Sequence, residues 1–302
     1  MNRRLVLPER GLNMSGRKKL LGLRMTSLLV VVLQFVGLSC RSVPVAQPDP
    51  EIPPEIARLL PGLYDENPNV REKTLWDLNR LHQSQDQVVR EATRLLTDEF
   101  DTTRGAAATV IGLVALYNLD YPEAIDQANI EHAFNAAILP LIELFKNKNE
   151  RSFVRSDALN ALAMIGQGQS KDTILPVLIE SLAEDDDSMR KTACTGLGSI
   201  GAPAATAVPL LTERLRDDSP RVRSAALESL GKFGKDASAT WPEMVKMVDD
   251  PSAEVRFSLI GALLEFRDSR PEEYKKILTV LSEDDDPYVR ELATDLLAIV
   301  DD

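Results

Sequence analysis

The sequence predicts an all-α fold, an α-solenoid superhelix of about seven helical hairpins. Three observations support this prediction. An arginine preceded by an apolar residue recurs about every 33 residues, apolar residues follow it at helical spacing, and no segment alternates with period 2 between hairpin turns. Self-similarity at a fixed period of roughly 20–50 residues is typical of stacked repeats, in which each unit buries its apolar stripe against its neighbours.

The chain opens with a basic segment beside an apolar run. Residues 1–47 carry eight Lys or Arg against one acidic residue, and sixteen uncharged residues separate Arg24 from Arg41. A basic stretch followed by a short apolar run is the pattern of a secretory signal, and about 17–25 residues are needed to span a bilayer. Residues 1–40 are therefore predicted to be a signal peptide or a signal anchor. The start codon stays open among Met1, Met14 and Met25.

Cys40 ends the apolar run, with the small residue Ser39 just before it. This position resembles that of the lipidated cysteine in bacterial lipoproteins, although Gly37 stands where their pattern has a leucine. The resemblance implies a lipid anchor on Cys40. An uncleaved signal anchor, plain secretion and a misread start are the alternatives. In an exported chain the positive flank stays inside, so we expect a membrane-anchored protein of the cell envelope with its repeat domain outside the cytoplasm.

Residues 41–54 form a proline-rich linker, with five prolines in fourteen positions. Such a segment favours extended geometry and is predicted to hold the body away from the bilayer. The body, residues 55–302, is acidic, because the chain from residue 48 onward has 27 basic and 46 acidic residues, a balance of −19. An acidic body repels phosphate backbones, which argues against a nucleic-acid partner.

The first helix of each hairpin is marked by an arginine and four columns around it. The residue before the arginine is mostly apolar, as are those seven and ten after it, and the residue three after is mostly alanine. These offsets lie on one stripe of a helix, and the small column allows close helix–helix approach. Asp, Ser or Asn before the stripe predicts an N-cap, and Gly166, Gly201 and Gly234 are predicted C-caps. The anchoring arginines are Arg71, Arg104, Arg155, Arg190, Arg223, Arg256 and Arg290.

A second helix is predicted after the first in most units. Its expected start is a proline within an apolar stretch, because proline suits the first turn of a helix and little else in it. These prolines are Pro140, Pro176, Pro209 and Pro242. Residues 118–134 break the period as an insertion, and this part of the chain brings in Tyr117, Tyr121 and Phe134. The insertion is predicted either as a longer loop with a short extra helix or as part of a functional face.

Two helices per roughly 33 residues, the first opening with D-x-x-V-R, resemble the HEAT-repeat family, and more narrowly the short bacterial repeats of the phycobilisome-lyase type. The resemblance covers about residues 55–302 and implies a HEAT/armadillo-like solenoid. It says little about activity, because one fold hosts many functions. It also implies that an aspartate pairs with the arginine of a neighbouring unit, here Asp218 with Arg223, Arg190 or Arg256.

Catalytic and metal-binding patterns are weak in this sequence. Two cysteines and two histidines leave too few ligands for a four-thiolate site, and Cys194 falls in an apolar column, as expected for a core thiol. Residues 196–201 read G-x-G-x-x-G but lie in the second half of a predicted helix, not between a strand and a helix. The acidic clusters between units lack calcium-loop spacing and are predicted to cap helices, with incidental cation binding as the alternative. We therefore expect no enzyme activity, no cofactor and no metal.

The predicted function is a non-catalytic protein-binding scaffold, exported and membrane-anchored. Helical solenoids offer an extended surface lined by second helices. The candidate contact residues there fall off the apolar stripe: Glu180, Glu213, Arg214 and Lys246. The expected partner is a protein, with no small-molecule substrate. The alternatives are a lyase-type subunit that handles a bilin chromophore in the cytoplasm, and a structural envelope spacer.

Overall fold

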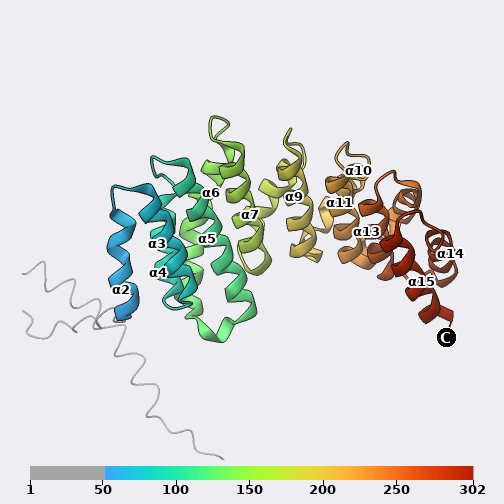
Figure 1. The fold of residues 1–302 in the computed structure, drawn as a ribbon, viewed down its shortest axis with the longest axis horizontal. Helices are drawn as coiled ribbons and strands as arrows, with labels where there is room; N and C mark the ends of the chain where they lie inside the picture. Colours follow the sequence, from blue (N-terminus) through green and yellow to red (C-terminus); the bar gives the residue numbers. More distant parts are fainter. Residues whose placement is uncertain (1–51, 302) are drawn as a thin grey trace, which may run out of the picture. The chain divides into compact units, whose positions relative to one another are not determined.

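The computed structural model describes residues 52–301, and within that range the chain forms helices joined by turns, with no strand (Figure 1). The all-α fold class and the α-solenoid architecture are thereby confirmed. The predicted signal segment, Cys40 and the linker up to residue 51 lie outside the described residues. In the described part, no helix has both the length and the apolar character needed to cross a membrane.

The predicted first helices are all present, and the anchoring arginine is the fourth residue of each one. This constant position follows from the apolar stripe, which begins one residue before the arginine. Side chains of Asn67 and Asp186 cap α3 and α9 as predicted, whereas α5 and α7 follow Phe100 and Arg151, which do not cap them. The first helices are α3 (Pro68–Arg80), α5 (Asp101–Asp120), α7 (Ser152–Gly168), α9 (Asp187–Ile200), α11 (Pro220–Phe233), α13 (Ala253–Leu264) and α15 (Pro287–Asp301).

The second helices alternate with them. They are α2 (Pro54–Leu59), α4 (Gln85–Leu95), α6 (Gln127–Lys146), α8 (Lys171–Ser181), α10 (Val208–Arg214), α12 (Trp241–Val245) and α14 (Pro271–Leu281). Short 3-10 helices extend or introduce several of these: η1 (Leu60–Tyr64), η2 (Pro122–Ala124), η3 (Ala202–Ala207), η4 (Gly234–Thr240) and η5 (Lys246–Asp249).

The starts predicted for the second helices are right in two units and wrong in two. Pro209 and Pro242 are the second residues of α10 and α12, whereas Pro140 and Pro176 lie inside α6 and α8. In α6 the helix starts earlier because the side chain of Asp126 caps it, accepting hydrogen bonds from two backbone N–H groups. A proline inside a helix leaves the carbonyl four residues earlier without its partner. That residue is exposed in both helices, so water can reach it.

The insertion lengthens the two helices beside it. α5 and α6 each have 20 residues, and only η2 and a few turn residues separate them. The predicted C-caps Gly201 and Gly234 are confirmed, with φ of 72° and 51°. Gly166 is wrong as a cap and lies inside α7. A Cβ on it would stand 3.0 Å from Ile200 Cδ1, so glycine there allows close packing.

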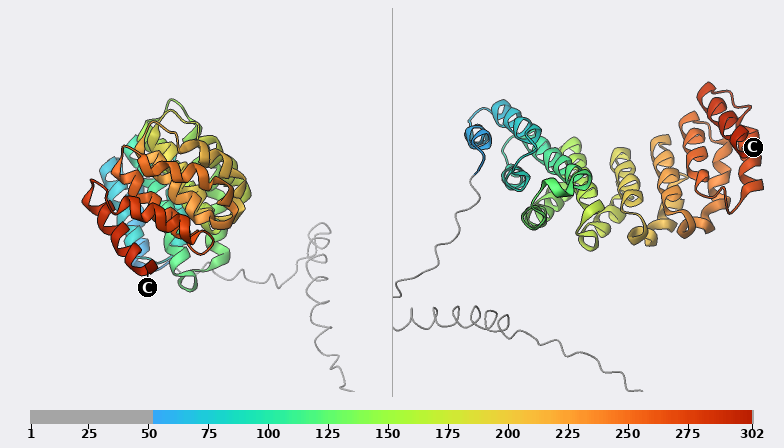
Figure 2. Two further views of the ribbon diagram at one scale, coloured as in Figure 1. Left: turned by 90° about the vertical axis from the view of Figure 1, so that its right-hand side faces the viewer. Right: turned by 90° about the horizontal axis from the view of Figure 1, so that it is seen from below.

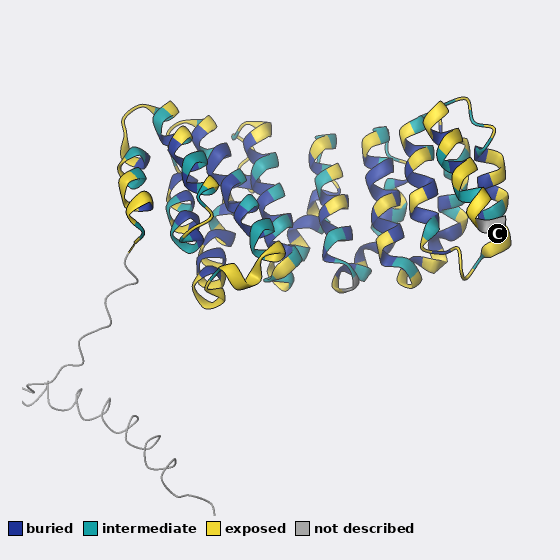
Figure 3. Ribbon diagram, turned by 60° about the horizontal axis from the view of Figure 1, so that its bottom comes forward, coloured by how far each residue is buried: buried dark blue, intermediate teal, exposed yellow. Residues whose placement is uncertain are grey.

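The helices form two layers around a continuous apolar core. Successive first helices pack on one another from α3 to α15, and second helices such as α8 pack on the first helices of their own and the following unit. The right view of Figure 2 shows this succession from a further side, and Figure 3 shows buried positions where helices face one another, with exposed ones at the turns. The small column is fully buried, as predicted: Ala107, Ala158, Ala193, Ala226 and Ala293.

Candidate functional site

A ladder of ion pairs runs along the array, from each first helix to the loop that precedes the next one. Each rung joins an anchoring arginine to a carboxylate 27 to 29 residues later, or 46 residues later across the insertion. The rungs, with their guanidinium–carboxylate N–O distances, are Arg71–Asp98 (2.7 Å), Arg104–Glu150 (2.7 and 2.8 Å), Arg155–Glu184 (3.0 Å), Arg190–Asp217 (2.8 and 2.8 Å), Arg223–Asp250 (2.8 and 2.8 Å) and Arg256–Asp284 (2.7 and 2.7 Å).

Most neighbouring rungs of the ladder are linked, because they share a residue. Arg223 Nη1 donates at 2.8 Å to the main-chain carbonyl of Asp217, whose side chain already receives Arg190. Arg256 uses the carbonyl of Asp250 in the same way. Arg155 is the exception, since its Nε donates to Phe145 O at 2.7 Å. Two-point arginine–carboxylate contacts are strong and fix orientation, so the ladder sets how one unit sits on the next.

The predicted ion pairs between aspartates and arginines of neighbouring units are present, but the aspartate named for them, Asp218, does not form one. Asp217, not Asp218, supplies the carboxylate to Arg190, and Asp218 contributes only a carbonyl, 3.2 Å from Arg223 Nη1. The reason lies in the loop, where Asp217 also accepts the backbone N–H of Ser219 at 3.0 Å. The carboxylate therefore points back toward the preceding first helix.

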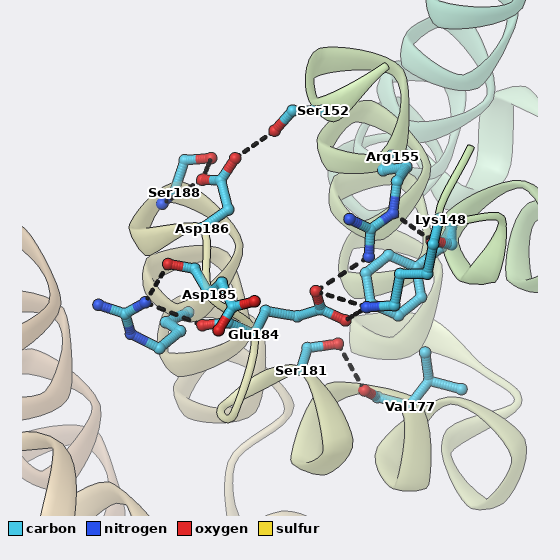
Figure 4. Close-up of polar contacts among 11 residues, drawn as sticks. Lys148, Ser152, Arg155, Val177, Ser181, Glu184, Asp185, Asp186 and Ser188 are labelled. Carbon is cyan, nitrogen blue, oxygen red and sulfur yellow. Dashed lines mark hydrogen bonds and ion pairs between the residues drawn. The ribbon is translucent and has the colours of Figure 1, made fainter. Parts of the chain in front are cut away.

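Glu184 connects three units through its side chain and its carbonyl (Figure 4). Lys148 Nζ lies 2.6 and 2.8 Å from its two oxygens, and Arg155 adds a contact of 3.0 Å. Its carbonyl accepts Arg190 Nη1 at 2.8 Å. Two residues on, Asp186 caps α9 through the backbone N–H of Ser188. The acidic cluster of residues 184–187 thus connects units and caps a helix, as predicted for caps.

Contacts with the arginines lower the pKa of several ladder carboxylates. The hydrogen bond from Arg256 lowers the pKa of Asp284, and that from Arg104 lowers the pKa of Glu150. Burial alone would raise the pKa of Asp217, but the hydrogen bonds and charge of Arg190 outweigh it and lower that pKa. At neutral pH Asp284, Glu150 and Asp217 are therefore ionised and paired with their arginines.

The second-helix face displays three of the four predicted contact residues. Glu180 and Lys246 are exposed and form surface pairs, Glu180 with Lys146 at 2.8 Å and Lys246 with Glu243 at 2.6 Å. Glu213 is exposed as well. Arg214 was expected to be exposed, and this is wrong: it turns inward, and its Nη1 donates to Leu182 O at 3.1 Å. The face therefore carries mixed charge, with Arg214 tied to the preceding unit.

The described part of the chain matches a family model over a limited stretch. Residues 175–241, from α8 to the start of α12, match the family described as HEAT repeats. This stretch is similar to HEAT repeats. It lies within the region for which the resemblance was predicted. A search of curated proteins found no match.

Solved structures give several similar chains at low identity. An engineered protein from a structural genomics consortium is 20% identical with a TM-score of 0.48, covering 82% of this chain and 96% of its own. A second engineered protein is 18% identical with a TM-score of 0.43, covering 82% and 78%. The complex of CpcE and CpcF of phycocyanin lyase from Nostoc sp. PCC7120 is 17% identical with a TM-score of 0.49, covering 87% and 100%.

The remaining residues singled out in the sequence, Cys194 and the G-x-G-x-x-G run, lie in the packed interior of the helical array. Cys194 is fully buried in α9, and burial raises the pKa of its thiol to about 12. The G-x-G-x-x-G run ends at the cap of the same helix, where a Cβ on Gly198 would meet Ser229 of α11. Among residues 52–301, no group of three His, Cys, Asp or Glu side chains is placed to hold a metal ion.

Two features of the array were missed at the sequence level. His82 stacks on Tyr117 at 4.4 Å between ring centroids, and Tyr117 lies 4.9 Å from Tyr121, so the insertion joins its aromatic residues to the turn after α3. Asp157 lies on α7 against Gly105 of α5, and burial raises its pKa to about 6. Neither contact has a local signal, because each joins residues more than thirty positions apart.

Proposed function

We propose that residues 55–302 are a non-catalytic protein-binding scaffold, exported and anchored to the membrane through the N-terminus, that presents its second-helix face to a protein partner. The observation that supports this most is the division of charge in the array. The ladder arginines are bound to buried or half-buried carboxylates, whereas Glu180 on α8, Glu213 on α10 and Lys246 at the start of η5 stay exposed. A regular array with exposed, only surface-paired charges along it suits an extended partner.

The chemistry of the partner follows from the charge. The chain from residue 48 onward has a balance of −19, so a basic or mixed-charge protein segment is favoured. Exposed charges mainly steer association and are screened by salt, with a Debye length of about 8 Å at physiological ionic strength. Binding should therefore weaken as ionic strength rises.

We expect Glu180→Lys with Glu213→Lys to reduce capture of the partner severalfold by slowing association, without unfolding the array. The exposed pair of Glu180 with Lys146 contributes about 0–1 kcal/mol to stability, so its loss is tolerated. The measurement is a pull-down from envelope extract at low salt, followed by association kinetics with the captured protein.

The matched control changes two exposed glutamates on the first-helix layer, Glu254→Lys with Glu265→Lys, which alter the net charge by the same amount. Capture that falls equally in both variants would point to net charge and not to the second-helix face. No capture by the wild type would favour the envelope spacer, and a pigment that copurifies with the chain would favour the bilin-handling subunit.

Anchoring is tested at Cys40. We expect Cys40→Ala to release the protein from the membrane fraction or to block its processing, because the thiol is the point of acylation in the lipoprotein reading. Fractionation and mass analysis of the mature N-terminus provide the measurement. If the variant stays membrane-bound and uncleaved like the wild type, the anchor is the uncleaved signal segment and not a lipid on Cys40.

A further inference from the structure

A cavity lies where the insertion meets the end of α7. Its walls come from the last turns of α5, from η2, from α6 and from the end of α7, and its volume is about 240 Å³. α5 and α6 each have 20 residues, whereas α7 has 17, and Figure 1 shows the joined ends of α5 and α6 extending past the end of α7. The residues that break the repeat therefore form part of a concave site.

Small residues leave room for this cavity. Gly168 has no side chain, and a Cβ on it would stand 3.2 Å from Leu119 Cδ2, so the end of α7 lies close to α5. Ala115 adds only a methyl group to the wall. Because Gly168 and Gln127 border the cavity and are exposed, a ligand can enter it from solvent.

The lining of the cavity is uncharged. Apolar side chains, among them Phe134 and Ile165, form most of the wall, and the polar residues of the lining are neutral amides. The cavities beside the ladder differ, because its arginines and carboxylates line them. A charged ligand loses its hydration in a largely apolar cavity and finds no opposite charge there. The lining therefore favours a neutral ligand with an apolar body.

Two of the amide side chains are already paired at the rim of the cavity. Gln127 Nε2 donates to Asn118 Oδ1 at 3.0 Å and to the carbonyl oxygen of Pro122 at 2.5 Å. These bonds hold the start of α6 against the end of α5. The rim is thus shaped before a ligand binds, which lowers the cost of ordering it.

The third amide, Gln169, directly follows α7 in the wall of the cavity. Its side-chain Nε2 is buried and has no hydrogen-bond partner among residues 52–301. A buried donor without an acceptor is costly, and an acceptor brought by a ligand removes that cost. An oxygen atom on the apolar ligand therefore suits this site.

We propose that this cavity binds a small neutral molecule with an apolar body and one carbonyl oxygen, which accepts the hydrogen bond of Gln169 Nε2. An apolar cavity of about 150 Å³ can hold one benzene molecule, so 240 Å³ suits a ligand of about ten non-hydrogen atoms. None of the contact residues named for the protein partner lines this cavity. The proposal therefore stands or falls separately from the scaffold function.

The test is carbon-13 NMR of methionine methyl groups in the full chain in mild detergent, because Met164 lines the cavity. The probe is acetophenone, whose ring shifts nearby methyl signals and whose carbonyl supplies the acceptor. The Met164 signal, assigned with Met164→Leu, should shift saturably with a dissociation constant of about 1 mM, as expected for a probe of this size. Met189 and Met244 are fully buried elsewhere and should not respond.

A second probe isolates the hydrogen bond. α-Methylstyrene has the shape of acetophenone with a CH₂ group in place of the oxygen, so it leaves Gln169 without an acceptor. It should bind at least about threefold more weakly to the wild type. Gln169→Leu should remove this preference, whereas Gln167→Leu, two residues earlier and outside the lining, should keep it.

Filling the cavity is the complementary change. Ala115→Leu should abolish the Met164 shift with both probes, whereas Ala128→Leu at an exposed position of α6 should leave it unchanged. Circular dichroism should show equal helicity in every variant. The proposal is overturned if the wild type shows no saturable shift of Met164, if the other methionines shift alike, or if Gln169→Leu keeps the preference for acetophenone.

Discussion

We expect Asp250→Ala to lower the free energy of unfolding by about 3–5 kcal/mol, because removing one partner of a buried ion pair leaves the other charge uncompensated. Asp250 and Arg223 are 5% and 12% exposed at their side chains and share two contacts of 2.8 Å. Without the carboxylate, the guanidinium of Arg223 stays buried with only main-chain carbonyls as acceptors. Equilibrium urea unfolding followed by far-UV circular dichroism measures the loss.

The control is a solvent-exposed arginine–aspartate pair of the same protein. Asp268 lies 3.3 Å from Arg267, with side chains 92% and 55% exposed, so Asp268→Ala should change stability by less than about 0.5 kcal/mol. Adding Arg223→Met to Asp250→Ala should cost less than the sum of the single changes, because no unpaired charge remains. Additive losses, or equal losses at Asp250 and Asp268, would contradict a structural role for the ladder.

We expect Leu230→Ala to cost about 2–5 kcal/mol, because it removes three carbons from a closed core and leaves a cavity. Leu230 is 0% exposed in the middle of α11, which packs between α9 and α13. The change should reduce the capture of a partner only in proportion to the unfolded fraction. Urea unfolding and a pull-down at a temperature where the variant stays folded separate the two effects.

Leu139→Ala on α6 is the matched control, since Leu139 is 65% exposed and should lose less than about 0.5 kcal/mol. If Leu230→Ala abolishes capture while helicity and stability stay at wild-type levels, the core position would belong to the binding surface, which its burial contradicts.

Local sequence alone predicted the seven first helices, their buried stripe and the small column between them. The stripe needs only contacts three and four residues apart, and a cap acts within one turn, so both are readable from a single chain. The sequence also contains a pattern that indicates the ladder carboxylates: an acidic residue stands six positions before most anchoring arginines, as Asp217 does before Arg223. The pattern of acidic pairs does not tell which carboxylate turns back, so the sequence favours Asp218 as readily as Asp217.

The second-helix starts and the insertion were less readable. Pro140 lies deep inside α6 because an upstream cap at Asp126 and an exposed backbone position outweigh the lost hydrogen bond. Arg214 fell off the apolar stripe and was expected in solvent, yet it reaches the carbonyl of Leu182 in the preceding unit. Both outcomes depend on neighbours that the local pattern does not contain.

The sequence by itself determined the fold class, the repeat length and which face of each first helix is buried, because these follow from short-range periodicity. Only the tertiary structure decided which carboxylate meets which arginine, as when Arg104 pairs with Glu150, 46 residues away across the insertion. Ion pairs between units require the stacking of whole helices to bring distant loops within about 3 Å, and that stacking is a property of the assembled core.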